Sequence, residues 1–331
     1  NALFERYIES KKLADSTRSN YIATWNNRVR DEIGGMKVVQ VRPSHIRLFY
    51  SRLTKDGYSH STIKLIHNLL YPSFEMAVDD DIIRKNPAKD ALGDNGEPAK
   101  EKMALTPSQQ NRLLSFVERS SVYNVYLPML QIMIGTGCRC GELIGLTWVD
   151  VDMEKKEVSI SCQLIYKNYG DGYKFHVSTP KTDAGIRKIP MSDTVYKAFA
   201  AQKRQNFLQR IPRNVEIEGR TDFIFMSKNG RPLMPSAVNN VLYNIVAAYN
   251  KQETEQAKKE KREAEYMPSI SAHTLRHTGC TRMAEQGLDM KVVQYIMGHA
   301  NIGVTMEVYN HITERARIEN EIAKMDAVQV V

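Results

Sequence analysis

Apolar residues recur every three or four positions through residues 1–90, a spacing that predicts a set of packed helices. The first such stripe consists of Leu3, Phe4, Tyr7 and Ile8. Ser44 is expected to cap the helix that follows it, and residues 61–78 are expected to form a longer helix that Pro72 can kink. The pattern therefore indicates a helical first domain over residues 1–90.

A change to period-two alternation marks residues 156–190 as the β region of the chain. Apolar side chains alternate at Val158, Ile160, Cys162 and Leu164, and the alternation resumes after a turn at residues 168–172. Residues 191–250 return to helical spacing. We therefore expect a mainly α chain with a small antiparallel β-sheet in its second domain.

Polar residues 91–103 contain two glycines and a proline, which is typical of an interdomain linker. Thr106, Pro107 and Gln109 then form a capping box, so a helix is expected to begin there. The second domain should accordingly span residues 104–312. Residues 313–331 remain as a tail with one narrow apolar stripe, made of Ile318, Ile322 and Met325.

Basic residues outnumber acidic ones, and the 331-residue chain carries a formal net charge of +8. Residues 11–64 hold eleven Lys or Arg against four Asp or Glu, which favours a surface that grips the DNA backbone over a merely solvated set of helix faces. The contacts we expect on this surface are Thr17, Arg18, Lys64 and His67. The charged run 251–265 is instead expected to be a solvated helix, and we assign it no role.

Four cysteines show no disulfide framework, and no apolar run approaches the length of a membrane span, so a reduced intracellular protein is expected. A zinc site could be drawn from Cys138, Cys140, His273, His277 and Cys280, but these spacings fit no ordinary ligand pairing. The sequence also lacks a Gly-rich loop ending in Lys-Ser or Lys-Thr and a carboxylate cluster for Mg²⁺. We therefore expect no metal and no cofactor.

The candidate chemistry is concentrated in residues 271–312, which contain His273, Arg276, His299 and Tyr309. His273 and Arg276 are three positions apart and so share one face of a helix, while Gly298 should end the next helix and leave His299 on a turn. Singly, each of these side chains has an ordinary structural explanation. Together, two imidazoles, a guanidinium and a phenol predict a site for a phosphate and a nucleophile.

A second segment, residues 135–146, supplies Arg139 with Glu142 one helical turn later. Alone, this pair could be a structural salt bridge. With Arg276 also present, two guanidinium forks can hold the non-bridging oxygens of one phosphate.

Arg139, His273-x-x-Arg276, Gly298-His299 and Tyr309 in this order resemble the signature of the tyrosine recombinases, the phage-integrase family. Residues 136–148 and 275–287 are most similar to integrases of conjugative transposons and temperate phages of Gram-positive bacteria. The resemblance covers nearly the whole chain. It implies a helical core-binding domain followed by an α+β catalytic domain, in which a hairpin carries a catalytic lysine matched by Lys181.

This resemblance implies site-specific recombination of double-stranded DNA at attachment sites, with integration and excision of a mobile element. Tyr309 would join the 3′ phosphate, Arg139 and Arg276 would stabilise its oxygens, and His273 would take the phenol proton. Lys181 would protonate the departing 5′ oxygen, His299 would support the phosphoryl group and Glu142 would orient the site. A four-way junction implies a homotetramer on DNA, and the family implies the bacterial cytoplasm. The tail is expected to dock either on the chain's own catalytic domain or, as in similar recombinases, on a neighbouring protomer.

Two other functions stay open at this stage. A type IB topoisomerase uses the same chemistry without a partner duplex, and a repressor could keep the fold without the chemistry, although the intact residue set argues against it. The sequence does not identify the target site, the mobile element, or an accessory DNA-bending or excision factor. Because the chain starts at Asn1 rather than Met, we expect a fragment or a processed protein, and related integrases often carry an additional N-terminal DNA-binding domain.

Overall fold

The computed structural model describes residues 1–98, 104–170, 172–180, 182–210, 212 and 215–310, with side chains as far as Met306 in the last helix. Lys181 and the tail 313–331 thus lie outside the described residues. The chain divides near residue 101 into two units, each with its own hydrophobic core. Within the described ranges, no helix is long and apolar enough to cross a membrane.

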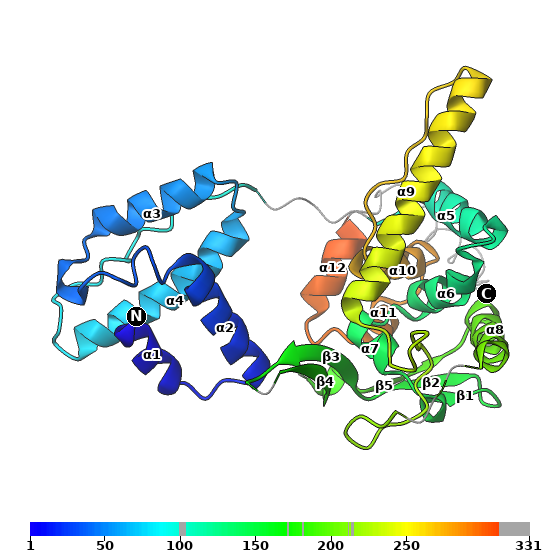
Figure 1. Ribbon diagram of the computed structural model, residues 1–331, viewed down its shortest axis with the longest axis horizontal. Helices are drawn as coiled ribbons and strands as arrows, with labels where there is room; N and C mark the ends of the chain where they lie inside the picture. The colour runs from blue at the N-terminus through cyan, green and yellow to red at the C-terminus, as the bar shows by residue number, and fades with distance from the viewer. Residues whose placement is uncertain (99–103, 171, 181, 211, 213–214, 311–331) are drawn as a thin grey trace, which may run out of the picture. The chain divides into compact units, whose positions relative to one another are not determined.

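The first unit is helical (Figure 1). Its elements are α1 (Ala2–Glu9), α2 (Asp15–Arg28), the 3-10 turn η1 (Val38–Gln40), α3 (Pro43–Lys55) and α4 (His60–Asp79). The other three helices all contact α4, because its apolar side chains supply the centre of this core. Pro72 lies inside α4, which continues past it to Asp79.

The expected Ser44 cap of α3 is wrong. The helix begins at Pro43, two residues earlier than a Ser44 cap would place it, and Arg42 occupies the capping position. The backbone N–H of Arg42 donates to Nδ1 of His45 at 3.2 Å. Proline is favoured at the first helical position for two reasons. Its φ is already helical, and a backbone N–H at this position, which proline lacks, would have no acceptor within the helix.

The second unit holds eight helices within its described part, joined by short 3-10 turns. The helices are α5 (Pro107–Arg119), α6 (Leu127–Thr136), α7 (Cys140–Gly145), α8 (Asp193–Gln209), α9 (Pro235–Glu260), α10 (Ala272–Glu285), α11 (Met290–Met297) and α12 (Ile302–Asn310). The turns are η2 (Asn124–Tyr126), η3 (Trp148–Asp150) and η4 (Asp183–Gly185). The predicted capping box at Thr106 is confirmed, and Asp289 caps α11.

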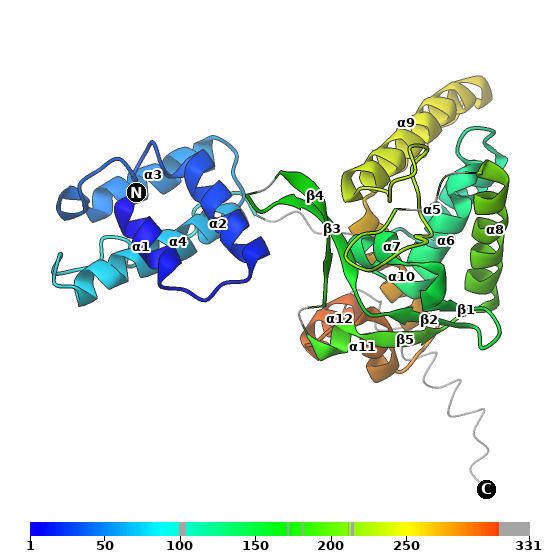
Figure 2. The same cartoon turned by 60° about the horizontal axis from the view of Figure 1, so that its bottom comes forward.

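Two small antiparallel sheets accompany these helices (Figure 2). One has the order β1-β2-β5, from β1 (Val151–Asp152), β2 (Glu157–Ile160) and β5 (Arg187–Pro190), and the other pairs β3 (Gln163–Asn168) with β4 (Tyr173–Ser178). The mainly α fold class with small antiparallel sheet structure is confirmed. The alternation expected through Cys162 is wrong, because this residue lies between β2 and β3, which belong to different sheets.

The charged run 251–265 is helical only as far as Glu260, the end of α9. Arg262 then donates from Nε to Glu260 at 2.7 Å and from Nη2 to Glu253 at 3.2 Å. These ion pairs close the turn that follows the helix. Figure 1 shows this end of α9 extending beyond the neighbouring helices of its unit.

Candidate active site

Arg139 and Arg276 are brought together by the ends of two packed helices. α6 ends at Thr136, Gly137 follows in the left-handed conformation, and Arg139 caps α7. Arg276 lies in α10, which packs against α6, and donates from Nη1 to the Gly137 carbonyl oxygen at 2.5 Å. The second arginine thereby fixes the loop that carries the first.

A pocket of about 380 Å³ opens beside these two arginines. Arg139, Arg276 and His273 all line it, together with Ser271, which caps α10. His273 is exposed, whereas Arg276 is buried at 4% exposure. His273 and Arg276 are three positions apart on α10, and the accessible imidazole and the nearly buried guanidinium therefore both reach the same pocket.

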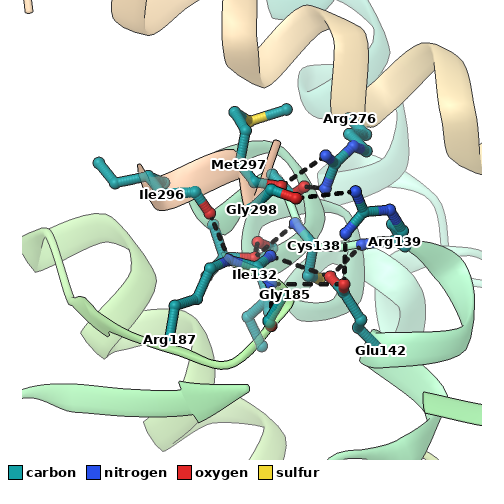
Figure 3. A network of polar contacts seen from close by, with 12 residues as sticks. Ile132, Cys138, Arg139, Glu142, Gly185, Arg187, Arg276, Ile296, Met297 and Gly298 are labelled. Carbon is teal, nitrogen blue, oxygen red and sulfur yellow. Dashed lines mark hydrogen bonds and ion pairs between the residues drawn. The ribbon is translucent and has the colours of Figure 1, made fainter. Parts of the chain in front are cut away.

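Three guanidiniums converge on the C-terminal end of α11 (Figure 3). Consecutive carbonyl oxygens accept hydrogen bonds from three different elements: Ile296 from Arg187 Nε at 2.6 Å, Met297 from Arg276 Nη2 at 2.6 Å, and Gly298 from Arg139 Nη2 at 3.0 Å. The carbonyls at the end of a helix carry the negative pole of its dipole, so they attract cations. This helix end therefore sets the mutual positions of the arginines.

Glu142 is the buried anion of this cluster, at 2% exposure. It accepts from Arg139 Nη1 at 2.7 Å and from the Arg139 backbone N–H at 2.8 Å, and Arg187 donates from Nη2 at 2.9 Å. Burial alone would raise the pKa of Glu142, but the hydrogen bonds and charges of Arg187 and Arg139 outweigh it and hold the pKa below its ordinary value. Glu142 therefore stays ionised and aligns both guanidiniums.

Burial, reinforced by the charge of Arg139, lowers the pKa of Arg276 to about 10. Arg276 thus remains a cation at neutral pH and can serve an anionic ligand. Cys140 lines the same pocket, but burial raises the pKa of its thiol to about 12, so it is not a ready nucleophile. Among the described residues, no group of three or more His, Cys, Asp or Glu is arranged to hold a metal ion.

His299 follows the end of α11 on a turn made by Gly298, whose φ is +62°. A Cβ at Gly298 would lie 3.0 Å from the Ala184 carbonyl oxygen, so both the conformation and the space require glycine. Nδ1 of His299 lies 3.0 Å from Oγ1 of the buried Thr305. Burial and the nearby arginines lower the pKa of His299 to about 4, so the ring is neutral. If Thr305 donates to Nδ1, Nε2 carries the proton and can donate to a phosphate oxygen.

Residues next to Lys181 and the helix that contains Tyr309 lie within the described part of the chain. Pro180 and Thr182, on either side of Lys181, line a second pocket of about 370 Å³ that Arg139 also borders. Tyr309 belongs to α12, which packs against α10 and α11, but its side chain lies outside the described residues. The catalytic roles of both residues therefore stay predictions.

The four expected DNA contacts all lie in the first unit. Lys64 is exposed on α4, and Thr17 is partly exposed on α2. Arg18 donates from Nη2 to the Lys11 carbonyl oxygen at 3.3 Å. His67 is half-buried, with its Nδ1 3.0 Å from the hydroxyl of Tyr50, so packing already engages it. Their contacts with DNA stay predictions.

Two residues of the site were missed in the sequence. Arg187 has the same strand parity as Ile189, which is the face that β5 buries, but arginines in a basic strand are usually assigned to the solvent face. Nothing in the sequence indicated that Thr305 belongs to the site, because its contact with His299 depends on how the turn at Gly298 folds. Both could be recognised only once their distant partners were placed.

This chain is similar to known proteins over most of its length. The family model described as the phage integrase family matches residues 103–315. The transposase from transposon Tn916 of Enterococcus faecalis is 35% identical over 288 residues, 86% of this chain and 66% of that protein, so the chain spans just under two thirds of that relative's length. A XerC-like tyrosine recombinase of Caldanaerobacter subterraneus subsp. tengcongensis is 25% identical over 324 residues, 95% of this chain and 78% of that protein.

Solved structures with the same fold include two integrases. The integrase of transposon Tn1549, solved with a circular intermediate DNA, is similar with a TM-score of 0.83 and 32% identity, covering 97% of this chain and 98% of that one. A lambda integrase dimer bound to a core site has a TM-score of 0.62 at 16% identity, covering 95% of this chain and 96% of that one, a likeness in fold alone.

Proposed function

We propose that this chain, which belongs to the phage integrase family, is a site-specific DNA recombinase that integrates and excises a mobile element of the conjugative-transposon type. The observation that carries the proposal is the placement of Arg139, Arg276 and His273 around one pocket. Two guanidiniums can bind the two non-bridging oxygens of a phosphodiester, and the imidazole can act as a base. The substrate we propose is double-stranded DNA at attachment sites.

In the first step Tyr309 attacks the scissile phosphate while His273 takes the phenol proton. A Tyr309–phosphate ester forms at the 3′ end, and the bond to the 5′ oxygen breaks. Lys181 gives that oxygen a proton, so a 5′ hydroxyl leaves. Negative charge grows on the non-bridging oxygens in this transition state, where Arg139, Arg276 and the neutral His299 stabilise it.

In the second step a 5′ hydroxyl of the partner strand attacks the same phosphorus and returns its proton to Lys181. The Tyr309 oxygen leaves with the proton held by His273. One phosphodiester has then replaced another, so the chemistry calls for neither a metal nor a nucleotide. Two such exchanges through a four-way junction require four protomers. In this assembly the helical unit 1–90 would bind the DNA backbone, and the tail 313–331 of each protomer would dock on a neighbour. The reaction would take place in the bacterial cytoplasm.

The test is covalent trapping on a nicked duplex whose short 5′ strand diffuses away after cleavage. The wild-type protein should form a protein–DNA adduct, and Tyr309→Phe should bind the duplex with unchanged Kd and form none, because it lacks only the attacking oxygen. An adduct formed by the Tyr309→Phe protein would reject Tyr309 as the nucleophile. If the wild-type protein formed no adduct, the recombinase function itself would be rejected.

A further inference from the structure

Arg187 lies deeper in the protein than the arginines that border the pocket. Its side chain is 0% exposed, whereas that of Arg139 is 41% exposed. Removing a guanidinium from water is costly unless its N–H groups find acceptors. Those of Arg187 donate to the carbonyl oxygens of Ile296 and Gly185 and to the Glu142 carboxylate (Figure 3). Without exposed surface, Arg187 cannot contact DNA.

The three acceptors of Arg187 lie in or beside three of the segments that carry proposed site residues. Glu142 holds Arg139, and Ile296 lies three residues before His299. Gly185 closes η4, which follows the Pro180–Thr182 segment. A single rigid, planar group thus sets the distances between these segments, because a guanidinium forks at fixed angles.

We propose that Arg187 is a positioning residue for DNA strand cleavage, which aligns Arg139, through Glu142, with the Gly298–His299 turn. This inference rests on the proposed recombinase function. The competing explanation is an ion pair that stabilises the core and does nothing more. Under that explanation, a folded variant without Arg187 would cleave DNA at the wild-type rate.

The pH dependence of cleavage separates the two explanations. The charged and titratable groups around Glu142 are Arg139, Arg187, Arg276, His299, Cys138 and Cys162. In an Arg187→Met variant, mainly Arg139 would remain to counteract the rise in the pKa of Glu142 that burial causes, so this pKa should increase. As the pH falls through this raised pKa, Glu142 becomes protonated and releases the Arg139 fork. Cleavage by the variant should therefore decline toward acid pH more than cleavage by the wild type.

The experiment measures single-turnover cleavage of the nicked duplex between about pH 5 and pH 8, together with Kd for the duplex and circular dichroism. Arg187→Met should stay folded and bind with a near-normal Kd but cleave roughly 100-fold more slowly at neutral pH, the loss typical of a reacting group displaced by about 1 Å. Its additional acid decline should be absent from Glu142→Gln/Arg187→Met. That double variant keeps His299 and lacks the titrating carboxylate, so it controls for titration of the histidine.

Wild-type cleavage by folded Arg187→Met would overturn the proposal, as would an acid decline that persists in the double variant. If the methionine variant does not fold, Arg187→Lys replaces it, because lysine keeps the buried charge but not the fork. A folded Arg187→Lys with normal Kd and slow cleavage supports the proposal, and one with the wild-type rate overturns it. Absence of any adduct with the wild-type protein would instead reject the recombinase function, so the two failures are distinguishable.

Discussion

Gly279 lies at a close contact between α10 and α6, and substituting it should displace the proposed phosphate-binding arginines. A Cβ at this position would lie 2.1 Å from the Ile134 carbonyl oxygen and 3.1 Å from its carbon. Both are backbone atoms, so no side chain can rotate away. Gly279→Ala therefore requires the two helices to separate by about 1 Å, a distance comparable to the misplacements that impair catalysis.

The expected change in stability is small because two effects oppose each other. Alanine favours a helix over glycine by about 1 kcal/mol. Overpacking a close contact typically costs about 1–3 kcal/mol. The free energy of unfolding should fall by up to about 2 kcal/mol, which lowers Tm by roughly 2–4 °C per kcal/mol in a unit of this size. A domain with about 5 kcal/mol of stability would then still be about 99% folded.

The expected change in activity is much larger. Arg276 on α10 donates to the Gly137 carbonyl on the loop leading to Arg139, so a shift of α10 moves the two arginines apart. Single-turnover cleavage of the nicked duplex should fall by roughly 100-fold, with Kd for the duplex nearly unchanged. Gly35→Ala in the first unit is the matched control, since a Cβ there meets nothing within 4 Å. A folded Gly279→Ala protein that cleaves as fast as the control would refute the link between this helix contact and the arginines.

Three further outcomes are expected. Arg139→Lys should lose far more cleavage than binding, because lysine lacks the fork that reaches both Glu142 and Gly298; near-normal cleavage would make Arg139 structural. Lys181→Ala should cleave ordinary DNA poorly but should recover cleavage on a substrate with sulfur at the bridging 5′ position, because sulfur leaves without a proton. Equal defects on the two substrates would exclude Lys181 as the acid. The pKa of His299 is lowered to about 4 from 6.5, so the unfolded state takes up the proton first and stability should decline as pH falls from about 6.5 toward 4. His299→Gln should flatten this decline in denaturant titrations, and an unchanged slope would contradict it.

Local signals in the sequence were sufficient for the elements that carry the site. Thr106 and Asp289 cap helices as their residue types predict, and Gly298 ends α11. Arg139 and Glu142 are only three residues apart, so their contact follows from one turn of helix. These features depend on neighbours in the chain, which is why a single sequence revealed them.

Features that depend on distant partners could not be predicted in the same way. Arg187 is separated from Glu142 by 45 positions and from Ile296 by 109, and although it shares the strand parity of Ile189, that parity does not identify partners so distant in the sequence. The β region was predicted as one alternating unit, but pairing partners assign β2 and β3 to different sheets. The convergence of three arginines on α11 likewise exists only after β5, α7 and α10 have packed around it.

That convergence also explains how cations remain close together in the absence of DNA. Arg139 and Arg187 share the Glu142 carboxylate, whereas Arg276 donates only to backbone carbonyls, and the repulsion from the other two arginines helps to lower its pKa. The carbonyls at the end of α11 offset part of this repulsion, because they carry the negative pole of the helix dipole. They have no net charge, so the three arginines keep a net positive charge that can attract a phosphate. A phosphodiester entering the pocket would meet donors already aligned, and the added charge of the transition state would be stabilised without rearrangement. In the proposed mechanism, this arrangement would favour the transition state over the ground state, which is what cleavage by a weak nucleophile such as tyrosine requires.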